Sequence, residues 1–537
     1  MKAIRRDRRS TRSTRSPREA SSAGASLPLR GATTAAVAIA FASLASASFA
    51  ATPAEADLIT TGRYLADAAH CGACHTRDEA RPYAGNLPIR SSFGTMYTSN
   101  ITPDRATGIG DWTLAQFTAA LREGKGRHGE PLYPAMPYTE LTKVTDADVA
   151  ALWAYLRSVP PVNEATRRNA MKFPFNVRSG VAAWQALFFR PGRYIVDTTQ
   201  TAEWNRGGYL VQGLGHCAAC HSPRTMAMSY RKGRALEGAT GQDWWYAPDI
   251  SGGRWSGIRD WSVADVQEYL KSGHNDRNVA AVGPMLQTIA QGTSRLAEPD
   301  RKAMAVYLKN QPAPERDATP PAPATLDAAR ADAGAQLYAE NCASCHGKSG
   351  TGVDGIAPAL ASNTALTGRG VENVARSVIQ GFAPQGRWGG MPSFASALSS
   401  REIADVANRV STAWGGTAEP PASPSSVDRL RMAVEPTIDP NARQALVCPG
   451  VPLSATDPTT SSAVQALAAR PGQEAALPGA LLAGYRARHP AAQPGAAITT
   501  LSALYCRELM QAGGDFAAKQ AKIVAFTSRL AAQDARR

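Results

Sequence analysis

Three copies of one five-residue pattern, C-x-x-C-H, lie along this chain of 537 residues. Two thiols one helical turn apart can each form a thioether bond with a vinyl group of haem, and the histidine that follows can bind the iron. Six of the eight cysteines fall in these motifs. The pattern therefore predicts three covalently bound haem c groups, held by Cys71, Cys74, Cys217, Cys220, Cys342 and Cys345, with His75, His221 and His346 as iron ligands.

A single C-x-x-C pair has other interpretations. It can be half of a zinc site, a thioredoxin-like redox pair or a disulfide. Zinc does not require a histidine directly after the second cysteine, and no strand–helix–strand pattern surrounds these motifs. Three copies that all end in histidine favour haem attachment over these alternatives.

The second axial ligand decides whether a haem transfers electrons or acts on small molecules. A methionine thioether opposite the histidine gives six-coordinate iron with a raised potential. One methionine beside a proline follows each motif, at Met136, Met285 and Met391. Because proline disfavours helix, we expect each methionine to lie in an extended, non-helical loop that directs it at the iron. For each of the three, a methionine that only fills the core is the alternative.

Five further histidines lie outside the motifs. His70 and His216 directly precede their motifs, and we expect them either near a haem edge, within reach of a propionate, or at the surface. His128, His274 and His489 lack the spacing of a metal site, so we assign them no role.

The N-terminal residues have the composition of an export signal. Nine basic residues are followed by an alanine-rich apolar run over residues 35–44 and by small residues that suit cleavage. We therefore expect a signal peptide over residues 1–56 and a periplasmic protein, with an organelle transit peptide as the alternative. This segment carries nine basic and three acidic residues, a net +6, so that +8 of the total +14 remains on the rest. Haem propionates would offset most of that charge, and we expect no nucleic-acid partner.

A repeated order of helix, haem motif, loop and helix defines the domain organisation. Thr145 and Ser399 precede closing helices with the spacing of a capping box. The first two units also share the repeat at residues 108–113 and 257–262, where Thr113 and Ser262 are the expected N-caps of helices ending near Gly124 and Gly273. We expect a mainly α protein of three tandem cytochrome c-type haem domains plus a small helical C-terminal extension. The boundaries are a signal peptide at 1–56, haem domains at 57–195, 196–312 and 328–416, a Pro-rich linker at 313–327, a second linker at 417–440 and the helical extension at 441–537.

The extension contains the two remaining cysteines. In an oxidising compartment we expect Cys448 and Cys506 to form a disulfide. Phe516, Ile523, Phe526 and Leu530 fall on one face of a terminal helix. That apolar face is either the core of a small domain or a docking face for a partner or membrane surface.

Five segments carry a resemblance to a known family. They are residues 99–104 (SNITPD), 132–138 (LYPAMPY), 204–210 (WNRGGYL) running into Gly215-His216-Cys217, 245–250 (WYAPDI) and Trp414-Gly415. Together they make residues 58–416 resemble the three-haem cytochrome c subunits of bacterial membrane-associated dehydrogenases, of the alcohol, gluconate and sorbitol type. Related subunits occur beside molybdenum-dependent aldehyde oxidoreductases.

The resemblance implies a chain that is no enzyme on its own and has no catalytic residues. Its haems would accept electrons from a separate catalytic subunit, which acts on alcohol or aldehyde donors with a flavin, molybdopterin or quinone cofactor. They would pass the electrons to ubiquinone or to a downstream cytochrome or oxidase, at the outer face of the inner membrane. The family's ligation implies the axial pairs His75–Met136, His221–Met285 and His346–Met391. Family members tend to end in a short membrane-contact segment, whereas residues 417–537 follow here.

Two other functions fit three haem motifs. A free-standing periplasmic electron carrier would have the same ligands but no permanent partner. A multihaem peroxidase or reductase would need one iron with an open or exchangeable distal side, which three methionine ligands would oppose.

Overall fold

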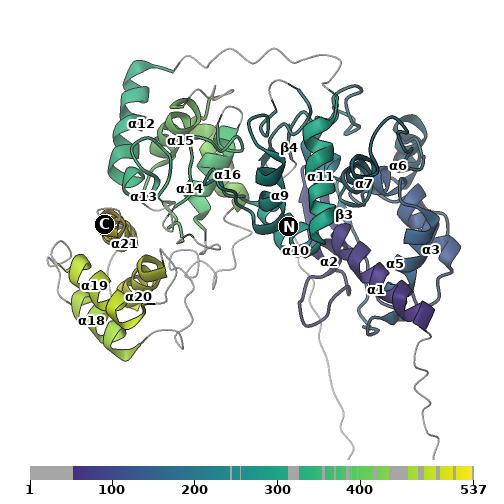
Figure 1. The fold of residues 1–537 in the computed structure, drawn as a ribbon, viewed down its shortest axis with the longest axis horizontal. Coiled ribbons are helices and arrows are strands. Elements are labelled where there is room, and N and C mark those ends of the chain that lie inside the picture. Colours follow the sequence, from purple (N-terminus) through teal and green to yellow (C-terminus); the bar gives the residue numbers. More distant parts are fainter. Residues whose placement is uncertain are drawn as a thin grey trace, which may run out of the picture. The chain divides into compact units, whose positions relative to one another are not determined.

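The computed structural model describes residues 53–241, 245–253, 256–312, 326–353, 357–367, 370–382, 388, 390–395, 397–414, 421–434, 457–469, 477–490, 496–511 and 516–534. These residues are mainly helical, as the sequence predicts (Figure 1). Among them, no helix is both long and apolar enough to cross a bilayer. Residues 1–52 of the predicted signal peptide, residues 313–325 of the Pro-rich linker and Cys448 lie outside the described residues.

The first haem segment, residues 57–195, contains six helices and a small sheet. The helices are α1 (Pro53–Ala68), α2 (Cys71–His75), α3 (Leu114–Glu123), α4 (Tyr138–Leu141), α5 (Asp146–Ser158) and α6 (Arg178–Phe188). Strands β1 (Pro88–Ser91), β2 (Gly94–Tyr97) and β3 (Ala170–Met171) form an antiparallel sheet in that order.

The second haem segment, residues 196–312, repeats the order of an opening helix, a motif helix, two strands and a closing helix. Its helices are α7 (Ala202–Tyr209), the π-helix η1 (Leu210–Leu214), α8 (Ala218–His221), α9 (Val263–Ser272), α10 (Pro284–Gln291), the 3₁₀ helix η2 (Thr293–Arg295) and α11 (Glu298–Asn310). Strands β4 (Ala239–Thr240) and β5 (Tyr246–Ala247) pair antiparallel.

The third haem segment and the extension contain the remaining helices. The third segment has α12 (Ala328–Asn341), α13 (Ala343–His346), α14 (Val371–Gln380) and α15 (Ser400–Thr412), followed by α16 (Pro424–Val434). The extension has α18 (Pro458–Ala468), α19 (Pro478–Arg488), α20 (Ala496–Gln511) and α21 (Phe516–Asp534).

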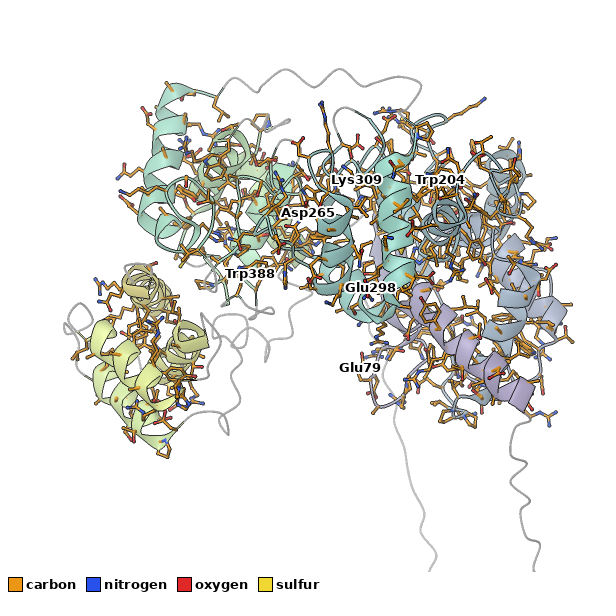
Figure 2. All side chains as sticks on the ribbon, in the orientation of Figure 1. Glu79, Trp204, Asp265, Glu298, Lys309 and Trp388 are labelled. Carbon is orange, nitrogen blue, oxygen red and sulfur yellow. The ribbon has the colours of Figure 1, made fainter. Side chains whose placement is uncertain are left out.

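The predicted helix caps are confirmed, except that Thr145 caps α5 by accepting from the amide of Asp148 without the returning bond of a capping box. Thr113, Ser262 and Ser399 each form a capping box, in which the side chain accepts from the backbone three residues on and the backbone donates back. For Ser262 the returning acceptor is Asp265, labelled in Figure 2. Helices α3 and α9 end at Gly124 (φ 64°) and Gly273 (φ 77°), whose left-handed backbone suits glycine.

Each haem segment begins with a helix that crosses the closing helix at a glycine. Helix α1 packs on α5, α7 on α11 and α12 on α15. A Cβ atom at Gly62 or Gly207 would lie 1.9 Å from a backbone carbonyl oxygen of the closing helix, and one at Gly334 would lie 2.4 Å away. Only glycine allows this approach. In the second segment the crossing is at Gly207, whereas its neighbour Gly208 lies against the side chains of Tyr194 and Tyr307.

A π-helix explains why the first two segments are not in simple register. Gly207 follows Gly62 by 145 positions, whereas Cys217 follows Cys71 by 146. The extra residue is absorbed where the chain forms the π-helix Leu210–Leu214 directly before the second motif. A single-turn π-helix is the usual result of inserting one residue into a helix.

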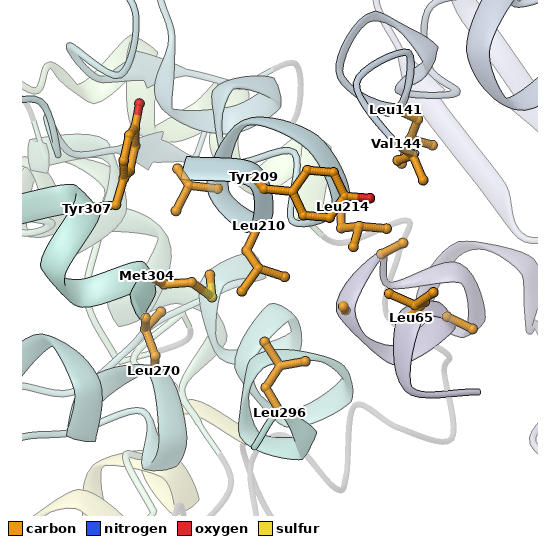
Figure 3. Close-up of a cluster of buried hydrophobic side chains, with 14 of the residues drawn as sticks. Leu65, Leu141, Val144, Tyr209, Leu210, Leu214, Leu270, Leu296, Met304 and Tyr307 are labelled. Carbon is orange, nitrogen blue, oxygen red and sulfur yellow. The ribbon is translucent and has the colours of Figure 1, made fainter. Parts of the chain in front are cut away.

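The first two haem segments share one hydrophobic core, although the sequence suggests separate domains. Leu65 and Val144 from the first segment belong to the same buried cluster as Leu210, Leu214 and Met304 from the second (Figure 3). Every one of these five side chains is at most 2% exposed. The buried cluster therefore continues from one segment into the other.

The segment expected as a second linker, residues 417–440, contains helix α16. Val427, Leu430 and Val434 are buried in the cluster that forms the core of the third haem segment. Their spacing of three and four residues puts them on one helical face, a short pattern that the surrounding Pro and Ser residues obscure in the sequence.

The C-terminal helices form a core of their own. Ile523, Phe526 and Leu530 are fully buried there, so the apolar face of α21 is a domain core and not a docking face. Cys506 is buried and disulfide-bonded, as predicted. His489 has a structural role, because its Nε2 lies 2.8 Å from Asp457 Oδ2.

Candidate haem-binding sites

The three motif histidines are held in the same way. His75 Nδ1 lies 2.7 Å from Ser99 O, and the Nδ1 atoms of His221 and His346 lie 2.7 and 2.9 Å from the carbonyl oxygens of Pro248 and Pro358. A carbonyl oxygen can only accept, so Nδ1 carries the proton and Nε2 carries the lone pair. This is the arrangement that fixes the tautomer and orientation of a metal-binding imidazole.

Burial also keeps these imidazoles in the form that binds iron. Removal from water lowers the pKa of His75, His221 and His346, because desolvation penalises the charged ring, and the backbone hydrogen bond opposes this only in part. Each ring is therefore neutral near pH 7. The three carbonyl acceptors were not predicted from the sequence, although Ser99 and Pro248 stand in two of the segments that carry the family resemblance.

The motif cysteines lack the properties of a redox-active pair. All six are thiols in the structure, outside any disulfide. Burial, followed by the neighbouring cysteine of each motif, raises the pKa of Cys71, Cys217 and Cys342 to about 12. Redox-active thiols need a lowered pKa and an electropositive setting. These surroundings therefore fit covalent haem attachment better than a thioredoxin-like pair.

The third segment brings its four predicted haem residues to one cavity. Cys342, Cys345, His346 and Met391 all line this cavity, whose empty volume is about 1250 Å³ including the space open to solvent. The other lining side chains of the third segment are mainly apolar, among them Leu366, Val374, Val378, Phe382, Phe394, Val406 and Val410. A flat apolar macrocycle with histidine and methionine at its iron fits such a lining. Met391 is extended as expected, since it exchanges two backbone hydrogen bonds with Phe382, of 2.8 and 3.0 Å.

The methionines of the first two segments lie against their shared core. Met136 and Met285 are both partly buried there, as are Cys71 and Cys217. Met136 lies in a turn, with its amide 3.1 Å from Tyr133 O. Met285 differs from the expectation of an extended loop, because it is the second residue of helix α10. Proline is favoured at the first position of a helix, so Pro284 begins this helix and does not prevent it.

His70 and His216 lie against each other in the interior. Their ring centroids are 5.4 Å apart with planes at 64°, and His70 is only 6% exposed. Both have a left-handed backbone, with φ of 53° and 37°. His70 Nε2 lies 3.0 Å from Thr288 O in the second segment, and His216 Nε2 lies 3.4 Å from Ala69 O in the first. For His70 the alternative of a surface position is therefore wrong. The two residues that precede the first and second motifs meet directly.

Two tyrosines join the same segments in a reciprocal manner. Tyr64 donates to Asp300 Oδ2 at 2.6 Å and accepts from the amide of Ala297 at the start of α11. Tyr209 donates to Asp148 and accepts from the amide of Thr145 at the start of α5. Each tyrosine thus binds the first turn of the other segment's closing helix. The two segments are consequently joined by contacts related by pseudo-twofold symmetry.

The aspartate of one such contact is also paired with an arginine. Arg206 donates two hydrogen bonds to Asp300, of 2.8 and 2.6 Å. Partial burial raises the pKa of Asp300, but the hydrogen bonds from Arg206 and Tyr64 outweigh it and lower the pKa overall. The carboxylate is therefore charged at neutral pH, which strengthens the hydrogen bond from Tyr64.

Comparison with known proteins agrees with this geometry. Residues 59–160 match the family described as cytochrome c, and residues 329–408 match cytochrome c oxidase, cbb3-type, subunit III. Over 406 residues the chain is 36% identical to the cytochrome c subunit of the alcohol dehydrogenase (quinone) of Gluconobacter oxydans, covering 71% of this chain and 84% of that protein. It is 34% identical over 396 residues to the gluconate 2-dehydrogenase cytochrome c subunit of Pantoea cypripedii, covering 70% and 89%. This chain belongs to the family of dehydrogenase cytochrome c subunits.

A further relative of this cytochrome c subunit has a longer chain. A subunit of the nicotinate dehydrogenase of Pseudomonas putida is 38% identical over 357 residues, which is 66% of this chain but only 30% of that protein. The resemblance seen in the sequence is confirmed at the level of the family. As a protein with cytochrome c domains, this cytochrome c subunit binds haem c covalently. The two matched regions contain the first and third motifs, and the second lies between them.

Proposed function

We propose that this chain carries electrons through three covalently bound haem c groups from a catalytic dehydrogenase subunit to ubiquinone or to a downstream cytochrome or oxidase. The catalytic partner would oxidise an alcohol or aldehyde with a flavin, molybdopterin or quinone cofactor. The site of action would be the periplasm, at the outer face of the inner membrane. The leader composition supports export, and the names of the relatives support the partner.

The observation that carries the proposal is the threefold repetition of one histidine geometry. In each C-x-x-C-H motif, a backbone carbonyl binds Nδ1 and leaves Nε2 available for iron. Three equivalent sites fit a carrier better than an enzyme, in which one site differs from the others. Haem c, when bound, supplies reversible one-electron chemistry at its iron.

The residues of this chain would hold the group and protect it. The six thiols would bind the haem edges covalently, while His75, His221 and His346 would bind iron on one side. Met136, Met285 and Met391 would bind on the other side, which leaves no position open for a small substrate. The apolar lining seen in the third segment would exclude water and so favour the less charged, reduced iron.

The proposal is tested by purifying the chain from native membranes and periplasm. We expect three haems per chain by pyridine haemochrome analysis. We also expect a stoichiometric large subunit with flavin, molybdopterin or quinone cofactor in mass spectrometry. A chain with three haems that purifies alone from both fractions would instead establish a free-standing carrier.

A further inference from the structure

The connection between the first two haem segments has an unusually apolar surface. Among the described residues, most of the large apolar side chains with high exposure lie between positions 173 and 196. Phe173 is 81% exposed, Leu187 65% and Ile195 86%. We call this the 173–196 surface, and it consists of Phe173, Phe175, Val177, Leu187, Phe188, Ile195 and Val196. Exposed large apolar side chains concentrated in one segment of a chain are typical of an interaction site.

Helix α6 carries part of this surface and buries few of its own side chains. Val181 is the buried residue of this helix, whose remaining described side chains are exposed or half-buried. The helix is nevertheless held in place from its inner side. Gln185 Nε2 donates to Gly124 O at 2.9 Å, and Trp184 Nε1 donates to Ala227 O at 2.7 Å. The exposure of Leu187 and Phe188 is therefore a feature of an anchored helix.

The charge of the same segment has one sign. Residues 165–196 contain six Lys and Arg residues and no Asp or Glu. Lys172, Arg178 and Arg190 donate to backbone carbonyl oxygens, which do not neutralise them. Arg193 shares Asp146 with Arg122. The charged side chains of this segment are therefore all basic.

We propose that the 173–196 surface docks on an anionic phospholipid bilayer. Phe173, Leu187 and Ile195 would enter the boundary between headgroups and acyl chains, while the basic residues would contact lipid phosphates. Bulky apolar side chains flanked by Lys and Arg are the composition of peripheral membrane-binding segments. This inference depends on the proposed function in one respect. The proposed function places the carrier at the membrane, and the inference names the surface that makes the contact.

The test uses the purified full-length holoprotein without its partner. It is sedimented with vesicles of phosphatidylcholine alone or mixed with phosphatidylglycerol. We expect binding to the mixed vesicles that weakens as salt is raised, and loss of this binding in the double variant Phe173→Ser/Leu187→Ser. The control is Leu58→Ser/Leu114→Ser, which removes two exposed leucines of the first segment, 43% and 42% exposed. This control should bind like the parent.

A second variant tests the charge. Lys172→Gln/Arg190→Gln should weaken binding about 30-fold, since each basic residue near an anionic surface contributes roughly 1 kcal/mol. Absence of vesicle binding by the parent, or equal binding by all variants, would overturn the inference. So would a Phe173→Ser/Leu187→Ser variant that binds vesicles normally but loses the catalytic subunit, because the surface would then be a protein interface.

The outcome is independent of the electron-transfer proposal. Haem stoichiometry and recovery of the catalytic subunit are measured in detergent, where the bilayer plays no part. A protein that keeps both but fails to bind vesicles refutes only the docking surface.

Discussion

At the scale of single residues, the axial ligands determine what this chain can do. Each motif histidine presents a neutral imidazole whose Nδ1 is bound to a backbone carbonyl. The methionines differ more in their local structure, since Met391 is extended whereas Met285 begins a helix. An iron ligand needs only its sulfur in place, so different backbones can serve the same role.

The methionine ligands can be tested by spectroscopy. Each of the substitutions Met136→Leu, Met285→Leu and Met391→Leu should abolish one near-infrared sulfur-to-iron band of the oxidised protein. Leucine has a similar volume but no sulfur, so the loss of stability should stay below about 1.5 kcal/mol. Met96→Leu is the control and should leave the spectrum intact. An unchanged spectrum in any of the three variants rejects that ligand.

The buried histidine pair predicts a pH dependence of stability. Burial, and to a lesser extent the charge of His216, lowers the pKa of His70 to about 4. The unfolded chain takes up this proton below about pH 6.5, whereas the folded protein stays unprotonated until about pH 4. The contribution of neutral His70 to the free energy of unfolding is therefore fully present above pH 6.5. It is lost as the pH falls towards 4. The expected loss is about 3 kcal/mol of unfolding free energy.

Denaturant unfolding between pH 7 and pH 4 measures this effect. The variant His70→Phe keeps an aromatic ring but cannot be protonated, so its stability should fall less with pH than that of the parent. His128→Phe changes an exposed histidine and serves as the control. Parallel curves for the parent and His70→Phe would show that His70 is not the group responsible.

At the scale of elements, each haem segment is built on the crossing of its first and closing helices. The glycines at these crossings allow the two backbones to approach within contact distance. The reciprocal tyrosines Tyr64 and Tyr209 then attach each closing helix to the other segment. The second segment has one more residue between its crossing glycine and its motif than the first segment has. The π-helix before the second motif accommodates this residue.

The substitution Gly62→Ala tests the first crossing. A Cβ atom there would lie 1.9 Å from a carbonyl oxygen of α5, so the helices must separate. We expect a loss of about 1 to 3 kcal/mol, as is typical of overpacking. The matched control is Gly180→Ala in α6, where a Cβ atom meets nothing within 4 Å. That change should raise the free energy of unfolding by about 0.5 to 1 kcal/mol, since alanine is the better helix former. Equal effects of the two substitutions in denaturant unfolding would contradict the close crossing.

At the scale of the whole molecule, buried contacts join the first two haem segments, and we expect them to unfold as one unit. Their side chains share a single buried cluster, which includes Leu65 and Leu210. The histidine pair and the reciprocal tyrosine contacts lie across the same junction. The first two C-x-x-C-H motifs are thus joined through the histidines that directly precede them.

Truncated fragments test whether the first two segments fold as one unit. A fragment of residues 57–312, matured with haem, should unfold in one transition with the same midpoint whether followed by Soret absorption or by circular dichroism. A fragment of residues 57–195 exposes half of the shared core and should not fold cooperatively. Cooperative thermal unfolding of the shorter fragment, with a midpoint near that of the longer one, would show that the first segment is a separate domain.

Features that depend on short spacings could be predicted from the sequence. The C-x-x-C-H motifs, the capping boxes at Thr113, Ser262 and Ser399 and the mainly helical fold follow from residues within one or two helical turns of each other. The family resemblance is also local, because each segment that carries it is a short run. The number of haems and the methionine ligands remain predictions that the structure is consistent with.

Contacts between distant groups became visible only in the folded chain. Ser99, Pro248 and Pro358 bind the motif histidines from 12 to 27 residues away, and no spacing in the sequence marks them. His70 and His216 are 146 positions apart, and a histidine beside a haem motif is as compatible with the surface as with the interior. Burial depends on what the rest of the chain packs around a residue. For that reason the shared core, the buried histidine pair and the exposed 173–196 surface could be recognised only after folding had placed their neighbours.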